Sequence, residues 1–121
     1  MGSRKTCEDA GMTSPDLPEQ PASDLPADAV ILDVREPDEW AAGHIEAAVH
    51  IPIGQVTARL ADIPQADPIY VICRGGGRSS RVSEFLSAQG IEAVNVAGGM
   101  QDWAASGRPM VSETGRPPEV I

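Results

Sequence analysis

One stretch of the sequence decides the fold, Ile69-Tyr70-Val71-Ile72-Cys73-Arg74-Gly75-Gly76-Gly77-Arg78-Ser79-Ser80. Its first four residues are apolar and suit a buried strand, whereas three glycines and two arginines follow Cys73. After this loop, a helical apolar pattern runs from Val82 to Gln89 and stops at Gly90. We therefore predict a strand, a sharply turning loop and a helix, with Cys73 where the strand ends.

Two features of this junction favour a negatively charged sulfur. The first N–H groups of a helix lack partners within it, and a Gly-rich loop adds further inward-facing N–H groups. The helix start carries Arg74, Arg78 and Arg81, and its first acidic residue is Glu84. We therefore predict that Cys73 is a nucleophile whose thiolate is stabilised. A buried structural cysteine is the alternative, but an apolar pocket gains nothing from two guanidinium groups.

The rest of the chain alternates strand-like and helix-like segments. Apolar runs predict strands at 30–34 and 91–96, and helical spacing predicts helices at 37–43, 53–63 and 100–106. No hairpin signal joins consecutive strands, so we expect these strands to run parallel. The sequence thus predicts an α/β fold, in which a mostly parallel sheet is covered by helices on both faces.

The 121 residues suit a single domain between two tails. Residues 1–19 are polar and lack periodicity, so we expect a flexible N-terminal tail. Within it, Met12 resembles a natural start, which would make residues 1–11 an artificial extension. We expect residues 20–111 to form the domain and residues 112–121, which contain Gly and Pro, to form a C-terminal tail.

The composition excludes several classes of function. Eighteen acidic and nine basic residues give a net charge of −9, which argues against non-specific nucleic-acid binding. The sequence contains neither an apolar run long enough to span a membrane nor a secretory signal. Its two cysteines, Cys7 and Cys73, do not form a disulfide framework, and no His/Cys spacing suggests a metal. We therefore expect a soluble cytoplasmic protein with a reactive thiol.

The loop Cys73-Arg74-Gly75-Gly76-Gly77-Arg78-Ser79 resembles the active-site loop of rhodanese-type sulfurtransferases. Two further matches are the stretch 31–45, which contains Asp-Val-Arg-Glu-Pro and Gly-His-Ile, and Gly98-Gly99-Met100-Gln101-Asp102-Trp103. The resemblance extends over roughly residues 20–111 in the family's order. One departure is Glu46-Ala47-Ala48, where the family usually has Pro-Gly-Ala. The resemblance implies a small, mostly parallel five-stranded sheet.

The resemblance also implies the chemistry. Cys73 would take a sulfane sulfur from a small anionic donor, thiosulfate or a persulfide, and pass it as a cysteine persulfide to cyanide, a thiol or a protein acceptor. Neither a metal nor an organic cofactor would be needed. The loop residues would have distinct roles: Arg74 and Arg78 orient the donor, Gly75, Gly76 and Gly77 let the backbone curl around the sulfur, and Ser79 and Ser80 donate hydrogen bonds or cap the helix.

Five further side chains are singled out without a predicted catalytic step. Asp33 and Arg35 follow the first buried strand, and we expect a structural ion pair, to which the resemblance adds a supporting role. In the family, the residue at His44 belongs to a structural turn, so it is not expected to act as a general base. We expect His50 to face outward and Trp40 to cover the core.

Three alternative functions remain to be compared. A cysteine phosphatase or arsenate reductase also has a Cys…Arg loop, but with one residue more than the four between Cys73 and Arg78. A sulfur-relay or regulatory interaction module with negligible turnover is compatible with the sequence. Nucleotide binding is not, because the loop has neither Gly-x-Gly-x-x-Gly nor a terminal Gly-Lys-Ser/Thr.

Overall fold

The structure, a computed structural model, describes residues 18–121. The predicted tail up to residue 17 lies outside the described residues, together with Cys7 and the expected start at Met12. The sheet begins at Glu19, so the folded chain includes residues just before position 20. None of the helices in the described range is long and apolar enough to cross a membrane.

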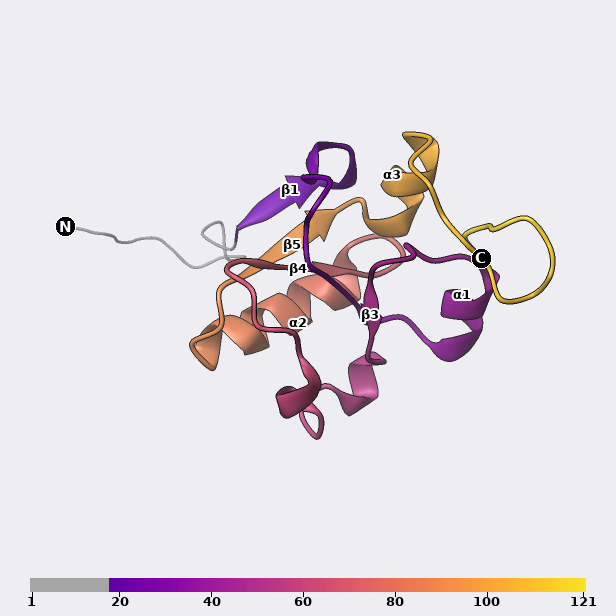
Figure 1. Ribbon diagram of the computed structural model, residues 1–121. Helices are drawn as coiled ribbons and strands as arrows, with labels where there is room; N and C mark the ends of the chain where they lie inside the picture. The colour runs from indigo at the N-terminus through magenta and orange to yellow at the C-terminus, as the bar shows by residue number, and fades with distance from the viewer. Residues whose placement is uncertain (1–17) are drawn as a thin grey trace.

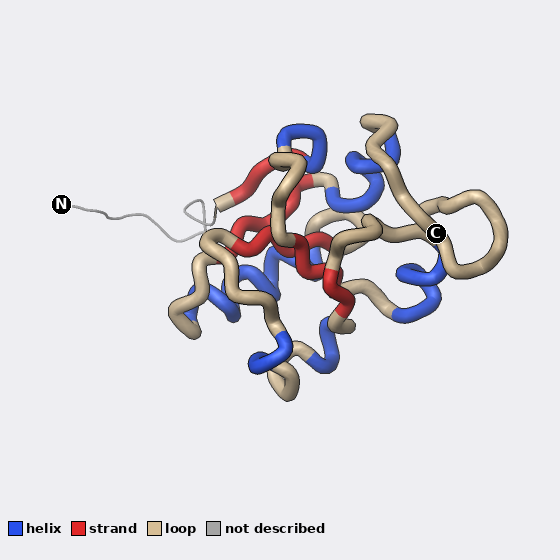
Figure 2. The backbone as a smooth tube through the Cα atoms, viewed as in Figure 1, coloured by secondary structure: helices blue, strands red, loops and turns tan. Residues whose placement is uncertain are grey.

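Five strands form one sheet in which every neighbouring pair is parallel (Figures 1 and 2). Their order across the sheet is β1-β5-β4-β2-β3. This confirms the predicted parallel five-stranded sheet. The strands are β1 (Glu19–Pro21), β2 (Ile31–Asp33), β3 (Val49–His50), β4 (Ile69–Ile72) and β5 (Ala93–Ala97).

Helices cover both faces of the sheet, as the sequence predicted. The helix that follows β4 lies on one face, and the helix that follows β5 lies on the other (Figure 1). The α-helices are α1 (Pro37–Ala42), α2 (Gly77–Ala88) and α3 (Gly99–Ala105), and the short 3-10 turns are η2 (Ala22–Asp24), η3 (Ile53–Gln55) and η4 (Leu60–Asp62).

The predicted helix over residues 53–63 is wrong. The segment forms two separate 3-10 turns, η3 and η4, although Val56 and Ile63 are buried as their spacing indicated. The segment lies between Pro52 and Pro64 and contains Gly54 together with β-branched residues, all of which weaken a short helix. The apolar spacing therefore predicted correctly which residues are buried, but not that they belong to one continuous helix.

The central strand β4 contributes to a core on each face of the sheet. Ile69, Val71 and the following Cys73 pack on the α2 side, whereas Tyr70 and Ile72 pack on the α3 side. Successive strand residues point to opposite faces, and a parallel strand between two helical layers is buried on both. Burying one such aliphatic side chain stabilises the fold by about 1.5–3 kcal/mol.

The strand register brings the ends of β2 and β4 together. Asp33 pairs with Ile72, and the Val34 N–H donates to the Ile72 carbonyl at 3.0 Å. The chain turns to one side after β2, toward β3, and to the other side after β4, toward β5. In parallel α/β sheets, ligands bind beside such a reversal at the carboxyl ends of the strands. Cys73 emerges at this edge.

The last ten residues, 112–121, lie against α1. The Glu113 and Glu119 N–H groups donate to the carbonyls of Ala41 and Ala42 at 2.8 and 3.0 Å. Val120 packs against the core on the α3 side. The segment that the sequence assigned to a C-terminal tail is thus held by backbone hydrogen bonds, and Figure 1 shows it looping beside α1.

Candidate active site

The loop between β4 and α2 turns at Gly76, which caps the start of the helix. Gly76 has a φ of 112°, a left-handed conformation that is costly for residues with a Cβ. This turn aims the Gly76 N–H at the Cys73 sulfur, 3.1 Å away. No side chain caps α2, so of the two alternatives predicted for Ser79 and Ser80 the capping is not seen, whereas the Ser79 hydroxyl donates a hydrogen bond to the Cys73 sulfur. The first turn of α2 contains no acidic residue.

The Cys73 sulfur is buried and hydrogen-bonded. The residue is 1% exposed, and Sγ accepts hydrogen bonds from the Gly76 N–H and from the Ser79 hydroxyl at 3.1 and 3.3 Å. Burial raises the pKa of the thiol, but hydrogen bonds from the Ser79 hydroxyl and from the amides of Ser79, Gly76 and Gly75 outweigh it. The pKa of Cys73 therefore lies below its usual value, which favours the nucleophilic thiolate.

The start of α3 fixes the other side of the loop. The Met100 and Gln101 N–H groups donate to the carbonyls of Cys73 and Arg74 at 2.8 and 3.0 Å. This approach requires Gly99, whose φ is 55° and at which a Cβ would overlap both carbonyl oxygens. The loop carbonyls are thus turned toward α3, which leaves the N–H of Gly76 facing the sulfur.

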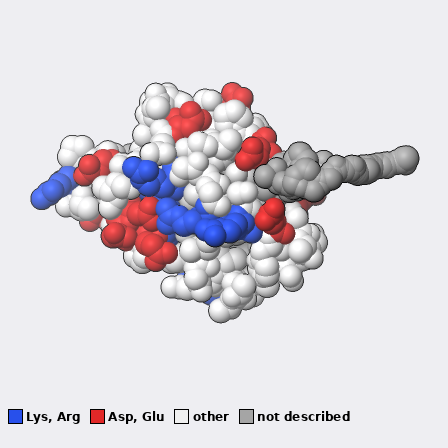
Figure 3. Space-filling view, turned by 180° about the vertical axis from the view of Figure 1, so that it is seen from behind, with Lys and Arg blue, Asp and Glu red and all other residues white. Residues whose placement is uncertain are grey.

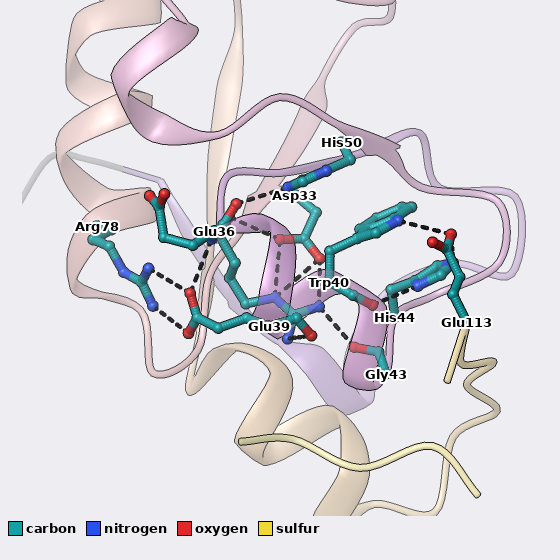
Figure 4. Close-up of polar contacts among 10 residues, drawn as sticks. Asp33, Glu36, Glu39, Trp40, Gly43, His44, His50, Arg78 and Glu113 are labelled. Carbon is teal, nitrogen blue, oxygen red and sulfur yellow. Dashed lines mark hydrogen bonds and ion pairs between the residues drawn. The ribbon is translucent and has the colours of Figure 1, made fainter. Parts of the chain in front are cut away.

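Arg78 is held by a carboxylate from α1 (Figure 4). Its Nη1 and Nη2 donate to the two oxygens of Glu39 at 2.8 and 2.9 Å. Oε1 of Glu39 also accepts the Glu36 N–H and completes the capping box of α1. The bond from Arg78 lowers the pKa of Glu39 to about 2, and Glu39 in turn raises the pKa of Arg78. Arg78 is therefore already paired within the chain.

A second ion pair lies at the end of β2 (Figure 4). Asp33 and Arg35 are 0% exposed, and Nε and Nη2 of Arg35 donate to the carboxylate at 2.8–3.1 Å. Nη1 and Nη2 also donate to the carbonyls of Glu39 and Gly43. The pair connects β2 to the middle of α1 and to its C-cap. Neither side chain hydrogen-bonds to the Cys73 loop in the described structure.

The two histidines sandwich Trp40 (Figure 4). The Trp40 ring stacks on His44 and His50 with centroid distances of 3.6 and 4.6 Å. His44 bonds through Nδ1 to the Trp40 carbonyl, and His50 bonds through Nε2 to the carbonyl of Arg35. Two expectations are therefore wrong: Trp40 belongs to neither core, and His50 is half-buried instead of facing outward. His44 forms an isolated antiparallel bridge with Val111, and among the described residues it makes no hydrogen bond to the Cys73 sulfur.

The other arginines around the loop differ in exposure from Arg78. Arg74 and Arg81 are exposed, and Nε of Arg74 donates to the Ile121 carbonyl at 3.0 Å. Figure 3 shows basic side chains gathered in a band on one face, with acidic groups beside it. All basic side chains of residues 18–121 are arginines. A positively charged area therefore exists on an otherwise acidic chain, as the sequence indicated.

The structure thus brings Cys73, Gly76 and Ser79 into direct contact, while Arg74 and Arg78 lie around them with other partners. Gly75 and Gly77 complete the loop on either side of Gly76. Sequence reasoning missed three polar residues that reach this site from other elements, Glu39, Asn95 and Glu19. Asn95 carried a detectable signal, because it interrupts the apolar run of β5 and a buried amide needs partners.

A cysteine held by N–H groups at the carboxyl edge of a parallel α/β sheet defines a class of thiolate proteins. The model of the rhodanese-like domain family matches residues 17–106, and the chain belongs to this family. A rhodanese-related protein from Thermoplasma volcanium has a similar solved structure, with a TM-score of 0.72 and 36% identity. The match covers 78% of this chain and 97% of that protein.

Named relatives agree with this assignment. A sulfurtransferase of Allochromatium vinosum is 35% identical over 73% of this chain and 83% of its own length. The thiosulfate sulfurtransferase PspE of Escherichia coli is 36% identical over 60% of this chain and 72% of PspE. YrkF of Bacillus subtilis, provisionally named a sulfur carrier protein, is 45% identical, but the match spans only 40% of YrkF. These relatives support a general sulfur-transfer activity.

Proposed function

We propose that the chain is a sulfurtransferase that carries sulfur as a persulfide on Cys73. One observation carries this proposal: Sγ accepts hydrogen bonds from the Gly76 N–H and the Ser79 hydroxyl, which lower the pKa of a buried thiol. A thiolate is needed both to attack a sulfur donor and to leave when the sulfur is passed on. A reducing compartment such as the cytoplasm suits this thiol.

The proposed reaction has two displacement steps. The Cys73 thiolate attacks the outer sulfur of thiosulfate, the sulfur–sulfur bond of the donor breaks, and sulfite leaves with the electron pair. The persulfide anion that remains is stabilised by the N–H groups of the loop. A thiolate or cyanide then attacks the outer sulfur, and Cys73 leaves as the thiolate. Before and after each step the negative charge lies on Cys73 or on the outer sulfur, so the same hydrogen-bond donors of the loop can stabilise it in every state.

The arginines have different proposed roles. Arg74 is exposed, and we assign to it the attraction of the anionic donor. Both Nη groups of Arg78 bond to Glu39, so we assign to Arg78 the positioning of the loop instead of direct donor binding. Asp33 and Arg35 support the site by fixing the end of β2 and the position of α1.

Cyanide-dependent sulfite release from thiosulfate tests this function. Cys73→Ser is expected to abolish it, whereas Cys7→Ser should leave the rate unchanged. Sulfur loading of Cys73 without steady-state turnover would replace the enzyme by a sulfur-relay module. Hydrolysis of an aryl phosphate that depends on Cys73 would contradict the proposal and favour a cysteine phosphatase.

A further inference from the structure

The hydroxyl group of Ser79 lies between two acceptors. Its oxygen is 3.3 Å from the Cys73 sulfur and 2.6 Å from Oδ1 of Asn95 on β5. All three residues are at most 1% exposed, so no bulk water substitutes for a lost partner. A serine hydroxyl has a single proton and can donate it to only one of these acceptors at a time.

The amide of Asn95 is fixed with its oxygen toward Ser79. Nδ2 lies 2.9 Å from a carboxylate oxygen of Glu19 on β1 and 3.3 Å from the carbonyl of Gly76. Both partners only accept hydrogen bonds when Glu19 is ionised, so the NH2 group must face them. The amide oxygen therefore faces Ser79, where it can only accept.

The preferred direction of the Ser79 proton depends on the state of the sulfur. With a neutral thiol, Ser79 donates to Asn95, and its own oxygen can accept the S–H of Cys73. With a thiolate, the same arrangement would point an oxygen lone pair at the negative sulfur. If the proton turns to the sulfur, Oδ1 of Asn95 loses its donor in a buried site. Ionisation of Cys73 thus forces a choice between two partners.

We propose that Asn95 is a positioning residue that competes with the Cys73 sulfur for the proton of Ser79, and that Glu19 fixes Asn95 in the competing orientation. The competition favours states with an uncharged Sγ, namely the thiol and the persulfide, whose negative charge lies on the outer sulfur. It opposes the thiolate. Asn95 therefore adjusts how readily Cys73 ionises and leaves, which deepens the proposed function and depends on it.

The charged groups around this chain of bonds are themselves paired. Glu19 accepts from Asn95, and Arg78 and Glu39 on the other side of the loop bond to each other. Among residues 18–121, no charged side chain hydrogen-bonds to Sγ of Cys73; its donors are Gly76 and Ser79. The charge of Arg78 also interacts with Cys73, but Arg78 is unchanged in every variant below, so differences in the thiol pKa between variants report on the loop and on the direction of the Ser79 hydroxyl.

A double-mutant cycle on the thiol pKa tests the proposal. The full chain with Cys7→Ser contains Cys73 as its single thiol, so thiolate absorbance against pH gives the pKa of Cys73 directly. Asn95→Leu, of similar size, is expected to lower this pKa by about 1, because Ser79 then donates to the sulfur without competition. Ser79→Ala is expected to raise it. In the Ser79→Ala background, the additional change Asn95→Leu should not lower the pKa of Cys73.

The cycle separates competition from simple support of the loop. If Asn95 only held Gly76 in place, Asn95→Leu would raise the pKa, and would do so with or without Ser79. The proposal would be overturned if Asn95→Leu raised the pKa of Cys73, or if it shifted this pKa equally with Ser79 present and in Ser79→Ala. Should Asn95→Leu fail to fold, Glu19→Gln is measured in the same two backgrounds, since its amide lets Asn95 turn over. If Glu19→Gln lowers the pKa of Cys73 when Ser79 is present but not in Ser79→Ala, the result supports the proposal. If it lowers the pKa in both backgrounds, the effect is purely electrostatic and contradicts the proposal.

This titration requires no sulfur donor, so its failure is distinct from failure of the proposed function. Wild-type protein that takes up no sulfur from thiosulfate would contradict the function and leave the cycle readable. An absent coupling between Asn95 and Ser79 in a protein that takes up sulfur would contradict only the competition.

Discussion

Two ion pairs that contact α1 differ in burial and in the segments that they join. Asp33–Arg35 is fully buried, with side chains 0% exposed, and joins β2 to the backbone of α1 at Glu39 and at the C-cap Gly43. Glu39–Arg78 is partly exposed, at 13% and 28%, and joins α1 to the cysteine loop. Breaking the first pair would strand a charge in the protein interior, whereas breaking the second would leave charges that solvent can reach. The comparison distinguishes a pair that stabilises the end of β2 from a pair that positions the Cys73 loop.

The largest effect is expected from breaking the buried pair. Arg35→Met removes the cation and leaves the Asp33 carboxylate uncompensated, which should destabilise the protein by about 3–5 kcal/mol. Urea denaturation followed by far-UV circular dichroism measures this change. The double variant Arg35→Met/Asp33→Leu should recover part of the loss, because it removes the stranded charge. A loss below about 1 kcal/mol in Arg35→Met would contradict the structural role of the pair.

Breaking the partly exposed pair should have a smaller effect. Glu39→Gln removes the charge partner of Arg78 but keeps a side chain that can complete the capping box. We expect a loss of about 1–2 kcal/mol in the same denaturation experiment, between the values for buried and surface pairs. Asp62→Asn, which breaks the exposed pair with Arg59, is the matched control and should cost less than about 0.5 kcal/mol. If Glu39→Gln and Asp62→Asn lost the same unfolding free energy, the Glu39–Arg78 pair would contribute no more than an ordinary surface pair.

The contribution of Glu39 should also depend on pH. Its pKa in the folded protein is about 2, against a usual value of 4.5, so the folded state favours the ionised carboxylate. The resulting stability is fully present above pH 4.5 and is lost as the pH falls toward about 2. The difference in unfolding free energy between wild type and Glu39→Gln should therefore shrink over this range. A difference that stays constant down to pH 2 would show that Glu39 acts without its charge.

The smallest effect on stability is expected from the exposed arginine. Arg74→Ala removes a side chain whose one hydrogen bond to the described residues reaches the Ile121 carbonyl, so the unfolding free energy should change by less than about 0.5 kcal/mol. The KM for thiosulfate should rise a few-fold, because the local positive charge that attracts the anion is reduced. High salt should diminish the difference between the two proteins. An unchanged KM at low salt would show that Arg74 does not attract the donor.

The sequence predicted most of the fold because each element carried a local pattern. β4, the glycine loop and α2 followed directly from an apolar run, three glycines and helical spacing. The segment 53–63 failed because its apolar spacing fits both a helix and a pair of 3-10 turns, and only the weak helix formers around Gly54 distinguish them. The prediction for Trp40 was wrong because the rings that stack on it come from later in the chain: His44 follows α1, and His50 lies in β3.

The site was predictable only as far as it is local in the sequence. Cys73, Gly76 and Ser79 lie within seven consecutive residues, and their contacts with one another are local in the sequence. Glu39 and Asn95 come from α1 and β5, and their pairing with Arg78 and Ser79 depends on the order of strands in the sheet. In the sequence Glu39 is one of several acidic residues at a helix start, a position that such residues commonly occupy for the helix dipole alone.

The most direct test of the central claim is the intact mass of the protein after thiosulfate treatment and removal of the small molecules. A persulfide on Cys73 should add about 32 Da, one sulfur, which cyanide removes again. Cys7→Ser should gain this mass, and Cys73→Ser should not. No gain on the wild type, or a gain that Cys73→Ser retains, would contradict the assignment of sulfur transfer to the Cys73 thiolate.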